Sequence, residues 1–453
     1  MNGWRKPFSK GEKFLQILIK GATIITMESP AAVIPGGVIA VAGPRILYAG
    51  PESALPANFL PDKIIDGVNL AALPGFVNCH THAAMTLFRS YADDLPLMQW
   101  LEEKIWPLEA GLQKEDIYWG TLLCCAEMIR SGTTTFADMY FHMGQAARAV
   151  EKAGLRASLS RGMIGTAPVG GAAGELPPLE YSVEFAKKWH GAAGGRITVM
   201  LGPHAPYTCP PDFMRRVIEA ARAFGLGIHI HLAETAGEVE DIKRRYGKTP
   251  IQLMDGLGLF ELPVLAAHCV HLEERDIEIL AAKKVGVAHN PQSNLKLASG
   301  IAPVARLLAA GAVVGLGTDG AASNNNQDMI EEMRTAALVQ KAAAGDPRAL
   351  PAFTALQMAT VNGARALGLA GEVGLLKAGY RADIILVNLR KPHLYPRHDP
   401  VAHLVYAAQG ADVETVLVDG RVLMENRKLL TMDEEEVLSK AEECAQRLVK
   451  RPK

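Results

Sequence analysis

The sequence has no excess of charge of either sign. Its 47 Lys and Arg residues are balanced by 48 Asp and Glu residues, which leaves a formal net charge of −1. Nucleic acids and anionic membrane surfaces are bound by clusters of positive charge, so this balance supports neither kind of partner. We therefore expect no nucleic-acid partner and no membrane partner.

Long hydrophobic runs are also missing. No stretch reaches the ~18 apolar residues that a transmembrane helix needs. Residues 1–13 are polar and basic, and the apolar stretch after them is interrupted by Lys20 and Gly21 without a small-residue cleavage site. This pattern predicts a flexible extension leading into a first strand, and it does not match a signal peptide.

The six cysteines form no C-x-x-C pair and no spacing typical of a disulfide framework. In a chain of 453 residues, this pattern favours reduced thiols and a cytoplasmic location. Apolar residues make up 49% of the chain, which is enough for a sizeable core. The length allows one large α/β domain and a smaller second domain.

Short β-like runs occupy residues 14–70 and return at 382–423, so we expect both chain ends to pair into one small β domain. A helix is predicted over 433–450. Between the ends, strand-like and helix-like stretches alternate, with strands predicted at 73–79, 133–138, 155–162, 197–202, 226–232, 264–269, 285–289 and 312–318. Eight such units without a Gly-rich nucleotide turn favour a closed barrel over an open sheet.

The predicted fold class is therefore α/β, with a (β/α)8 TIM-like barrel and a small β-sandwich domain built from both chain ends. We place the barrel at residues 71–370. The β-sandwich domain takes its N-terminal part from 1–70 and its C-terminal part, with the terminal helix, from 371–453.

Four short segments at the ends of predicted strands carry candidate metal ligands. They are Asn78-Cys79-His80-Thr81-His82, His229-Ile230-His231-Leu232-Ala233-Glu234, Ala267-His268-Cys269 and Gly317-Thr318-Asp319-Gly320. In parallel barrels, catalytic groups lie at the carboxyl ends of the strands. A His-x-His pair followed by single His and Asp residues is typical of a divalent metal with nitrogen and oxygen ligands.

The spacing of the histidines limits which of them can share a site. His80 and His82 are two residues apart, so they project to the same side of a strand. His229 and His231 also share a face, and either could be a ligand; we take His231, nearer the carboxyl end, and assign His229 to the barrel interior. Glu234 follows three residues later, which places a carboxylate close to the metal but not on it.

The remaining segments add a carboxylate and further polar groups. His268 could ligate the metal or hydrogen-bond its water, and His204 could face the substrate. Asp319 ends an apolar strand, where a bare carboxylate is costly unless it is paired or coordinated. The strand at 197–201 has no Lys that could be carbamylated to bridge two metals, which favours one ion. Zn²⁺ is the default, although Fe²⁺ or Mn²⁺ would accept the same ligands.

Several of these motifs resemble the amidohydrolase superfamily: Pro74 to His82, the H-x-x-E from His231 to Glu234, and Gly317-Thr318-Asp319. The segment from Arg89 to Leu101 is similar to the branch that deaminates 5′-methylthioadenosine and S-adenosylhomocysteine. That branch also contains chloro-triazine and related hydrolases. The resemblance covers nearly the whole chain.

The resemblance implies roles for individual residues. The metal ligands would be His80, His82, His231 and Asp319. Glu234 would be the proton shuttle and would also contact the substrate, and His268 would orient the water. The resemblance further implies a substrate pocket lined by Trp100, Glu109, Arg161, His204 and Ser323.

The implied reaction is hydrolytic deamination of the adenine ring of a small purine nucleoside. Hydroxide formed on the metal attacks C6 after Asp319 takes the proton of the water. Glu234 protonates the neighbouring ring nitrogen, and ammonia leaves. We also expect a homo-oligomer. Two alternatives stay open: a hydrolase of another aminated or chlorinated heterocycle, such as guanine or a triazine, and a non-catalytic scaffold, which should have lost ligands that are all present here.

Overall fold

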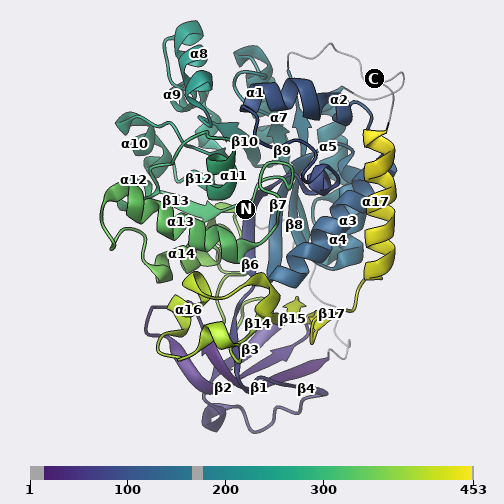
Figure 1. The fold of residues 1–453 in the computed structure, drawn as a ribbon, viewed down its shortest axis with the longest axis vertical. Coiled ribbons are helices and arrows are strands. Elements are labelled where there is room, and N and C mark those ends of the chain that lie inside the picture. The colour runs from purple at the N-terminus through teal and green to yellow at the C-terminus, as the bar shows by residue number, and fades with distance from the viewer. Residues whose placement is uncertain (1–14, 166–176, 451–453) are drawn as a thin grey trace.

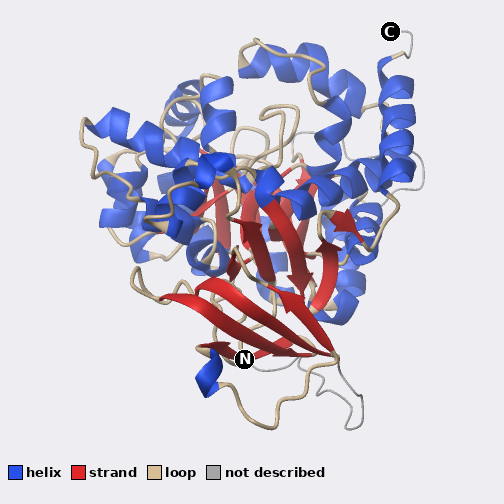
Figure 2. Ribbon diagram, turned by 60° about the horizontal axis from the view of Figure 1, so that its bottom comes forward, coloured by secondary structure: helices blue, strands red, loops and turns tan. Residues whose placement is uncertain are grey.

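The computed structural model describes residues 15–165 and 177–450, so the predicted extension at 1–13 lies outside the described residues. The chain forms an eight-stranded parallel sheet curved into a barrel, with a separate nine-stranded mixed sheet below it in Figure 1. Helices surround the barrel strands on the outside (Figure 2). The predicted α/β barrel and the small β domain from both chain ends are confirmed.

The barrel strands follow one another in chain order. They are β6 (Phe76–Thr81), β7 (Thr133–Tyr140), β8 (Arg156–Met163), β9 (Ile197–Pro203), β10 (Ile228–Leu232), β11 (Val264–His268), β12 (Gly286–His289) and β13 (Val313–Leu316). The ring closes just beyond β13, where the Asp319 N–H donates to the His80 carbonyl at 2.9 Å and the Thr318 N–H donates to Asn78 Oδ1 at 3.0 Å. Closure therefore brings the first and last candidate segments together.

The longer helices follow the barrel strands and cover them from outside. The longer ones are α3 (Lys114–Ser131), α4 (Met143–Ala153), α5 (Pro178–Trp189), α7 (Pro211–Phe224), α8 (Ala236–Tyr246), α10 (Glu274–Ala282) and α13 (Met329–Ala344). The shorter ones are α1 (Leu97–Trp100), α2 (Trp106–Glu109), α6 (Ala192–Gly195), α9 (Pro250–Gly256), α11 (Pro291–Lys296), α12 (Val304–Ala309), α14 (Ala352–Met358), α15 (Val361–Ala366) and α16 (Pro400–Tyr406). α7 is one example of an amphipathic helix: it buries Met214, Val217, Ile218 and Ala221 on one face.

The small sheet contains strands from both chain ends: β1 (Gln16–Ile25), β2 (Val33–Ala42), β3 (Arg45–Gly50), β4 (Lys63–Asp66), β5 (Leu70–Pro74), β14 (Ile384–Asn388), β15 (Val413–Val418), β16 (Arg421–Glu425) and β17 (Lys428–Leu429). β5 pairs with β14 in antiparallel fashion and so joins the two ends. The single strand predicted at 73–79 is divided at Gly75 between the two sheets. A Cβ at Gly75 would collide with Thr134, so the crossing point requires glycine.

The predicted terminal helix is α17 (Glu434–Val449), which packs against α3 of the barrel (Figure 1). It buries Val437, Ala441, Cys444 and Leu448, and Arg447 contacts the buried Asp116. None of the helices within the described ranges is long and apolar enough to cross a membrane. All six cysteines are free and buried.

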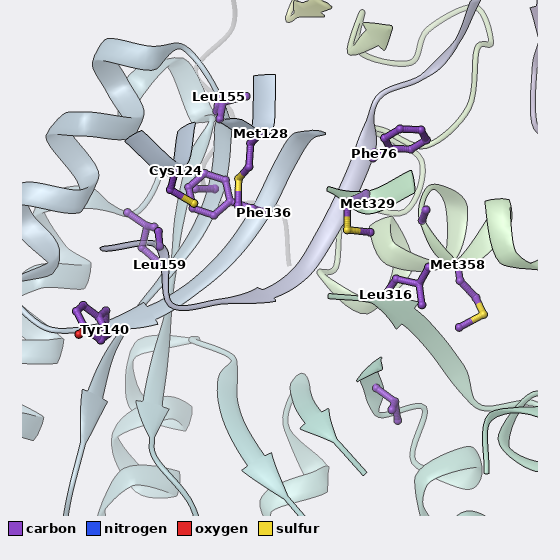
Figure 3. Close-up of a cluster of buried hydrophobic side chains, with 14 of the residues drawn as sticks. Phe76, Cys124, Met128, Phe136, Tyr140, Leu155, Leu159, Leu316, Met329 and Met358 are labelled. Carbon is purple, nitrogen blue, oxygen red and sulfur yellow. The ribbon is translucent and has the colours of Figure 1, made fainter. Parts of the chain in front are cut away.

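A core of large apolar side chains lies between the barrel wall and the helices. Figure 3 shows Phe76, Phe136 and Leu159 from the strands together with Cys124 and Met128 from α3. These side chains are completely or almost completely buried. Such close packing holds the strands rigidly, so side chains at their carboxyl ends have fixed positions.

Candidate active site

Four polar side chains meet where β6, β10 and β13 end. His80 Nε2 and His82 Nε2 each lie 3.3 Å from Asp319 Oδ1, and His231 Nε2 lies 3.3 Å from His82 Nε2. His80, His231 and Asp319 are buried, and the side chain of His82 is 18% exposed. Three ring nitrogens and one carboxylate oxygen therefore face a common point, in a geometry that could hold one divalent cation.

The hydrogen bond on the far side of each histidine ring determines which ring nitrogen faces the common point. His82 Nδ1 lies 2.6 Å from the Met139 carbonyl, and His231 Nδ1 lies 2.8 Å from the His204 carbonyl. A carbonyl only accepts hydrogen bonds, so both Nδ1 atoms carry a proton and both Nε2 atoms keep a free lone pair. His80 Nδ1 similarly contacts His229 Nε2 at 2.8 Å.

The pKa shifts favour neutral His80 and His231 rings and an ionised Asp319. Burial lowers the pKa of His80 to about 4 and that of His231 well below its usual value, so both rings are neutral near pH 7. Burial alone would raise the pKa of Asp319, but contact with His80 and the nearby His82 and His268 holds it well below its usual value. His80 Nε2 and Asp319 Oδ1 have no hydrogen-bond partner among the described residues. Two buried atoms of this kind are costly unless a cation satisfies them.

His229 lies behind this cluster. Its Nε2 contacts His80 Nδ1, and its Nδ1 is 3.5 Å from Ser160 Oγ. Both ring nitrogens are thus engaged inside the barrel, and the ring supports His80 from the side opposite Asp319. The structure brings His231 to the cluster and leaves His229 one layer deeper.

Glu234 and His268 stand beside the cluster. Glu234 Oε2 is 3.8 Å from His268 Nε2, and His268 Nδ1 is 2.9 Å from Asn294 Oδ1. Burial raises the pKa of Glu234. Burial lowers the pKa of His268, but Glu234 and Asp319 outweigh that effect and raise it. The two side chains can therefore share or pass a proton. His268 also lies near His80 and His231, so the geometry permits ligation as well.

The two oxygens of the Asp319 carboxylate have different partners. Oδ2 accepts hydrogen bonds from Ser293 Oγ at 2.7 Å and from Ser323 Oγ at 3.0 Å, while Oδ1 faces the histidines. The backbone at Asp319 and His268 has positive φ, at 62° and 73°. Strained backbone of this kind persists where the surroundings hold a side chain in a required direction.

A cavity of about 100 Å³ opens above the cluster. Its lining of apolar side chains with a few polar groups is typical of sites that bind small organic ligands. Of the residues predicted to line a substrate pocket, Trp100, Glu109, His204, Glu234 and Ser323 do so. Apolar side chains from one short segment, among them Leu97, Leu101, Ile105 and Trp106, form much of the wall.

Arg161 is not among the described residues that line the cavity. It lies two residues before the carboxyl end of β8, and its Nη1 donates to the Gly162 carbonyl at 3.0 Å. Its guanidinium lies over the Tyr181 ring, 5.4 Å from the ring centre.

Glu109 lines the same cavity as Asp319. It accepts a hydrogen bond from the Tyr140 hydroxyl at 2.8 Å. Burial raises the pKa of Glu109 to about 7, and the Tyr140 hydrogen bond partly offsets that effect. The carboxylate can therefore be ionised above neutral pH and accept hydrogen bonds from a ligand.

Several supporting side chains were not predicted from the sequence. Tyr140 positions Glu109, Asn294 contacts His268, and Ser293 contacts Asp319. Asp138 Oδ1 accepts from the Ala83 N–H at 2.7 Å and so holds the backbone next to His82. Asp138 and Tyr140 lie near the carboxyl end of β7, and Ser293 and Asn294 lie in α11, which follows β12. The rule that placed the four ligand segments at strand ends could have found them too.

Comparisons with known proteins agree with this geometry. The model of the amidohydrolase family matches residues 71–423. A 5-methylthioadenosine/S-adenosylhomocysteine deaminase of Pelotomaculum thermopropionicum is 62% identical over 435 residues, which cover 96% of this chain and 99% of that protein. An adenosine deaminase structure from Xanthomonas campestris with bound zinc has a TM-score of 0.92 at 36% identity and covers 96% of this chain and 99% of its own. The structure of an atrazine chlorohydrolase from Arthrobacter aurescens complexed with zinc has a TM-score of 0.86 at 26% identity, covering 95% and 100%.

Proposed function

The chain belongs to the amidohydrolase family, and we propose that it deaminates 5′-methylthioadenosine and S-adenosylhomocysteine by hydrolysis. Water replaces the amine on C6 of the adenine ring, so that the products are the inosine analogue and ammonia. The observation that carries the proposal is the convergence of His80, His82, His231 and Asp319 beside Glu234, at the floor of a cavity with apolar and polar lining.

We assign His80, His82, His231 and Asp319 as ligands of one divalent cation. The two unpartnered atoms, His80 Nε2 and Asp319 Oδ1, and the free lone pairs of the other two rings support this set. A set of three nitrogens and one oxygen suits zinc, and both solved structures compared above contain zinc. When bound, the ion would lower the pKa of a coordinated water towards neutrality.

Glu234 and Asp319 are the proposed proton-transfer groups. Asp319 accepts the proton of the attacking water, and Ser293 and Ser323 hold its other oxygen in place. Glu234 donates a proton to the ring nitrogen next to C6, so the ring accepts electrons without forming an anion. Its raised pKa keeps the protonated form available. Return of a proton to the amine then releases ammonia.

His268 and His204 have supporting roles in this proposal. His268 orients the water from its position next to Glu234, with its ring held by Asn294. His204 faces the cavity and bonds Thr208 Oγ1 through Nδ1 at 3.0 Å, which leaves Nε2 for the substrate.

Glu109 favours a nucleoside over a bare heterocycle. The same cation chemistry would serve a triazine, so the choice depends on contacts beyond the ring. A ribose offers two neighbouring hydroxyls, and a carboxylate facing the cavity can accept both hydrogens. A site built around a buried hydrogen-bonding group discriminates strongly against analogues that lack its partner.

Location and assembly are further parts of the proposal. The six buried free thiols suit a reducing compartment, and we propose that the enzyme is cytoplasmic and forms a homo-oligomer. Light scattering on the purified protein tests the assembly: a mass of one chain would contradict it.

The proposal is tested by a substrate panel assayed for ammonia, with elemental analysis of the same preparation. 5′-Methylthioadenosine and S-adenosylhomocysteine should be deaminated well, and adenine and melamine poorly. Elemental analysis should find close to one divalent ion per chain, and two ions per active chain would contradict the single-ion site. Equal activity on adenine would overturn the nucleoside assignment.

A further inference from the structure

The short segment that carries Glu109 contains an irregular helical turn. α1 (Leu97–Trp100) and α2 (Trp106–Glu109) are separated by a π turn, η3 (Leu101–Ile105). The Trp106 N–H bonds to the Leu101 carbonyl, five residues back. On either side the spacing is four, from the Leu101 N–H to the Leu97 carbonyl and from the Ala110 N–H to the Trp106 carbonyl. One turn is thus one residue wider than its neighbours.

The wide turn changes which side chain faces the cavity. In an uninterrupted α-helix, residue 108 would point within about 20° of Leu97, and residue 109 would point about 120° away. The structure shows the shifted register: Leu97, Leu101, Ile105 and Glu109 line the cavity. Leu108 instead lies in the hydrophobic core, 9% exposed. The additional residue in the turn therefore places a carboxylate where a regular helix would place a leucine.

Pro107 supplies a physical reason for the wide turn. A proline in a helix interior lacks the N–H for the bond to residue i−4, and its ring clashes with that carbonyl, here the carbonyl of Glu103. After the π turn, Pro107 instead falls in the first turn of α2, where proline is tolerated. Pi turns inside α-helices commonly occur at functional sites.

We propose that Pro107 is a positioning residue for substrate selection: it maintains the π turn Leu101–Ile105, which directs Glu109 into the cavity and Leu108 into the core. This inference rests on the proposed function, since it concerns the carboxylate that selects the ribose. Selection of nucleosides then depends on the register of this helical segment as well as on the Glu109 side chain.

The test is the ratio of kcat/KM for 5′-methylthioadenosine to kcat/KM for adenine. Pro107→Ala allows a regular helix, so the ratio should fall at least about 10-fold, as expected when a hydrogen bond to a charged group is lost. Deleting Lys104 in the Pro107→Ala protein shortens the segment by one residue, returns Glu109 to the cavity and should restore the ratio. Lys104→Ala in the same protein removes the side chain without changing the register, and should not restore it.

A second variant needs no deletion. In the regular helix of Pro107→Ala, position 108 faces the cavity, so adding Leu108→Glu and Glu109→Leu should restore the ratio. The same exchange with Pro107 intact should lower it. Metal content and activity on adenine, measured throughout, separate loss of selection from loss of the site.

The outcomes distinguish the two proposals. Wild-type protein that deaminates no nucleoside would overturn the proposed function, and this inference with it. Wild-type protein that is selective, while Pro107→Ala has an unchanged ratio, would overturn the positioning role of Pro107 alone. The positioning role would also be overturned if Pro107→Ala lowered the ratio but neither the Lys104 deletion nor the residue exchange restored it. Such a result would indicate ordinary destabilisation, which a change of helix register does not repair.

Discussion

Both ends of the barrel bury charged side chains, but the two ends differ in whether Arg side chains pair with the buried carboxylates. At the amino end, Arg156 Nε pairs with Asp383 at 3.0 Å and Arg156 Nη2 pairs with Asp419 at 2.7 Å. Arg381 Nη1 adds a bond to Asp419 at 2.9 Å. At the carboxyl end, Asp319 Oδ1 and His80 Nε2 face each other without a hydrogen-bond partner in the described parts of the chain.

This contrast separates a structural joint from a binding site. Arg156 belongs to the barrel, whereas Asp383 and Asp419 belong to segments next to the small sheet, so the amino-end cluster fastens the two parts of the molecule. Its charges neutralise one another. The carboxyl end directs three histidine rings and a carboxylate at one point, and no Lys or Arg among the described residues pairs with that carboxylate. Buried charge that is paired within the protein needs no ligand, and buried charge that is left unpaired indicates one.

The largest expected effect separates two histidines on one strand. His231→Ala should lose the bound ion and essentially all activity, because it removes a proposed ligand. His229→Asn should keep the ion, with a loss of roughly 1–3 kcal/mol in the free energy of unfolding from a buried polar mismatch. Elemental analysis and urea unfolding of both variants measure this. If His229→Asn emptied the site while His231→Asn did not, the assignment would be reversed.

The next effect concerns Glu234, which borders the carboxyl-end cluster without joining it. Glu234→Gln keeps the shape of the side chain but cannot transfer a proton. We expect kcat to fall by about 10²–10⁴-fold with the ion retained, the range typical of a general acid–base group. Loss of the ion together with activity would instead make Glu234 a ligand.

At the amino end, Arg156→Met should affect stability and not chemistry. Removing the cation leaves the buried Asp383 carboxylate without a charged partner, while Asp419 keeps Arg381; loss of one partner of a buried pair typically costs about 3–5 kcal/mol. Chemical denaturation should show this loss, while the metal content and KM of the folded protein stay unchanged. Arg348→Met, which breaks the exposed pair with Asp346, is the matched control and should show no measurable change. A variant of normal stability would show that Arg156 does not fasten the joint.

The smallest effect is a pH dependence at the cavity. Burial raises the pKa of Glu109 to about 7, so this carboxyl is protonated below neutral pH, where an ordinary Glu is ionised. Its capacity to accept both ribose hydrogens therefore falls as the pH drops through about 7. The ratio of kcat/KM for 5′-methylthioadenosine to that for adenine should rise with pH up to this value and then level off. Glu109→Gln should remove the dependence, and a ratio that falls with rising pH would contradict the role.

Much of the fold could be predicted because strand and helix periodicities are local. The eight barrel strands were found within a few residues of their ends, and so was the terminal helix. The break at Gly75 was missed, since an unbroken apolar run gives no sign that its two halves join different sheets. The packing of α17 on α3 likewise depends on contacts between residues more than 300 positions apart.

The sequence alone determined the chemical types at the site, because His-x-His, His-x-x-E and Gly-Thr-Asp are contiguous motifs placed after apolar strands. Tertiary structure decided which members of these motifs meet. His229 and His231 share a strand face, and the position of β10 against β6 brings His231 to His82 and leaves His229 behind His80. Leu108 and Glu109 are neighbours in the chain, and the wide turn before them decides which one faces the cavity. In both cases the outcome depends on rotation and depth relative to distant elements, which local patterns do not encode.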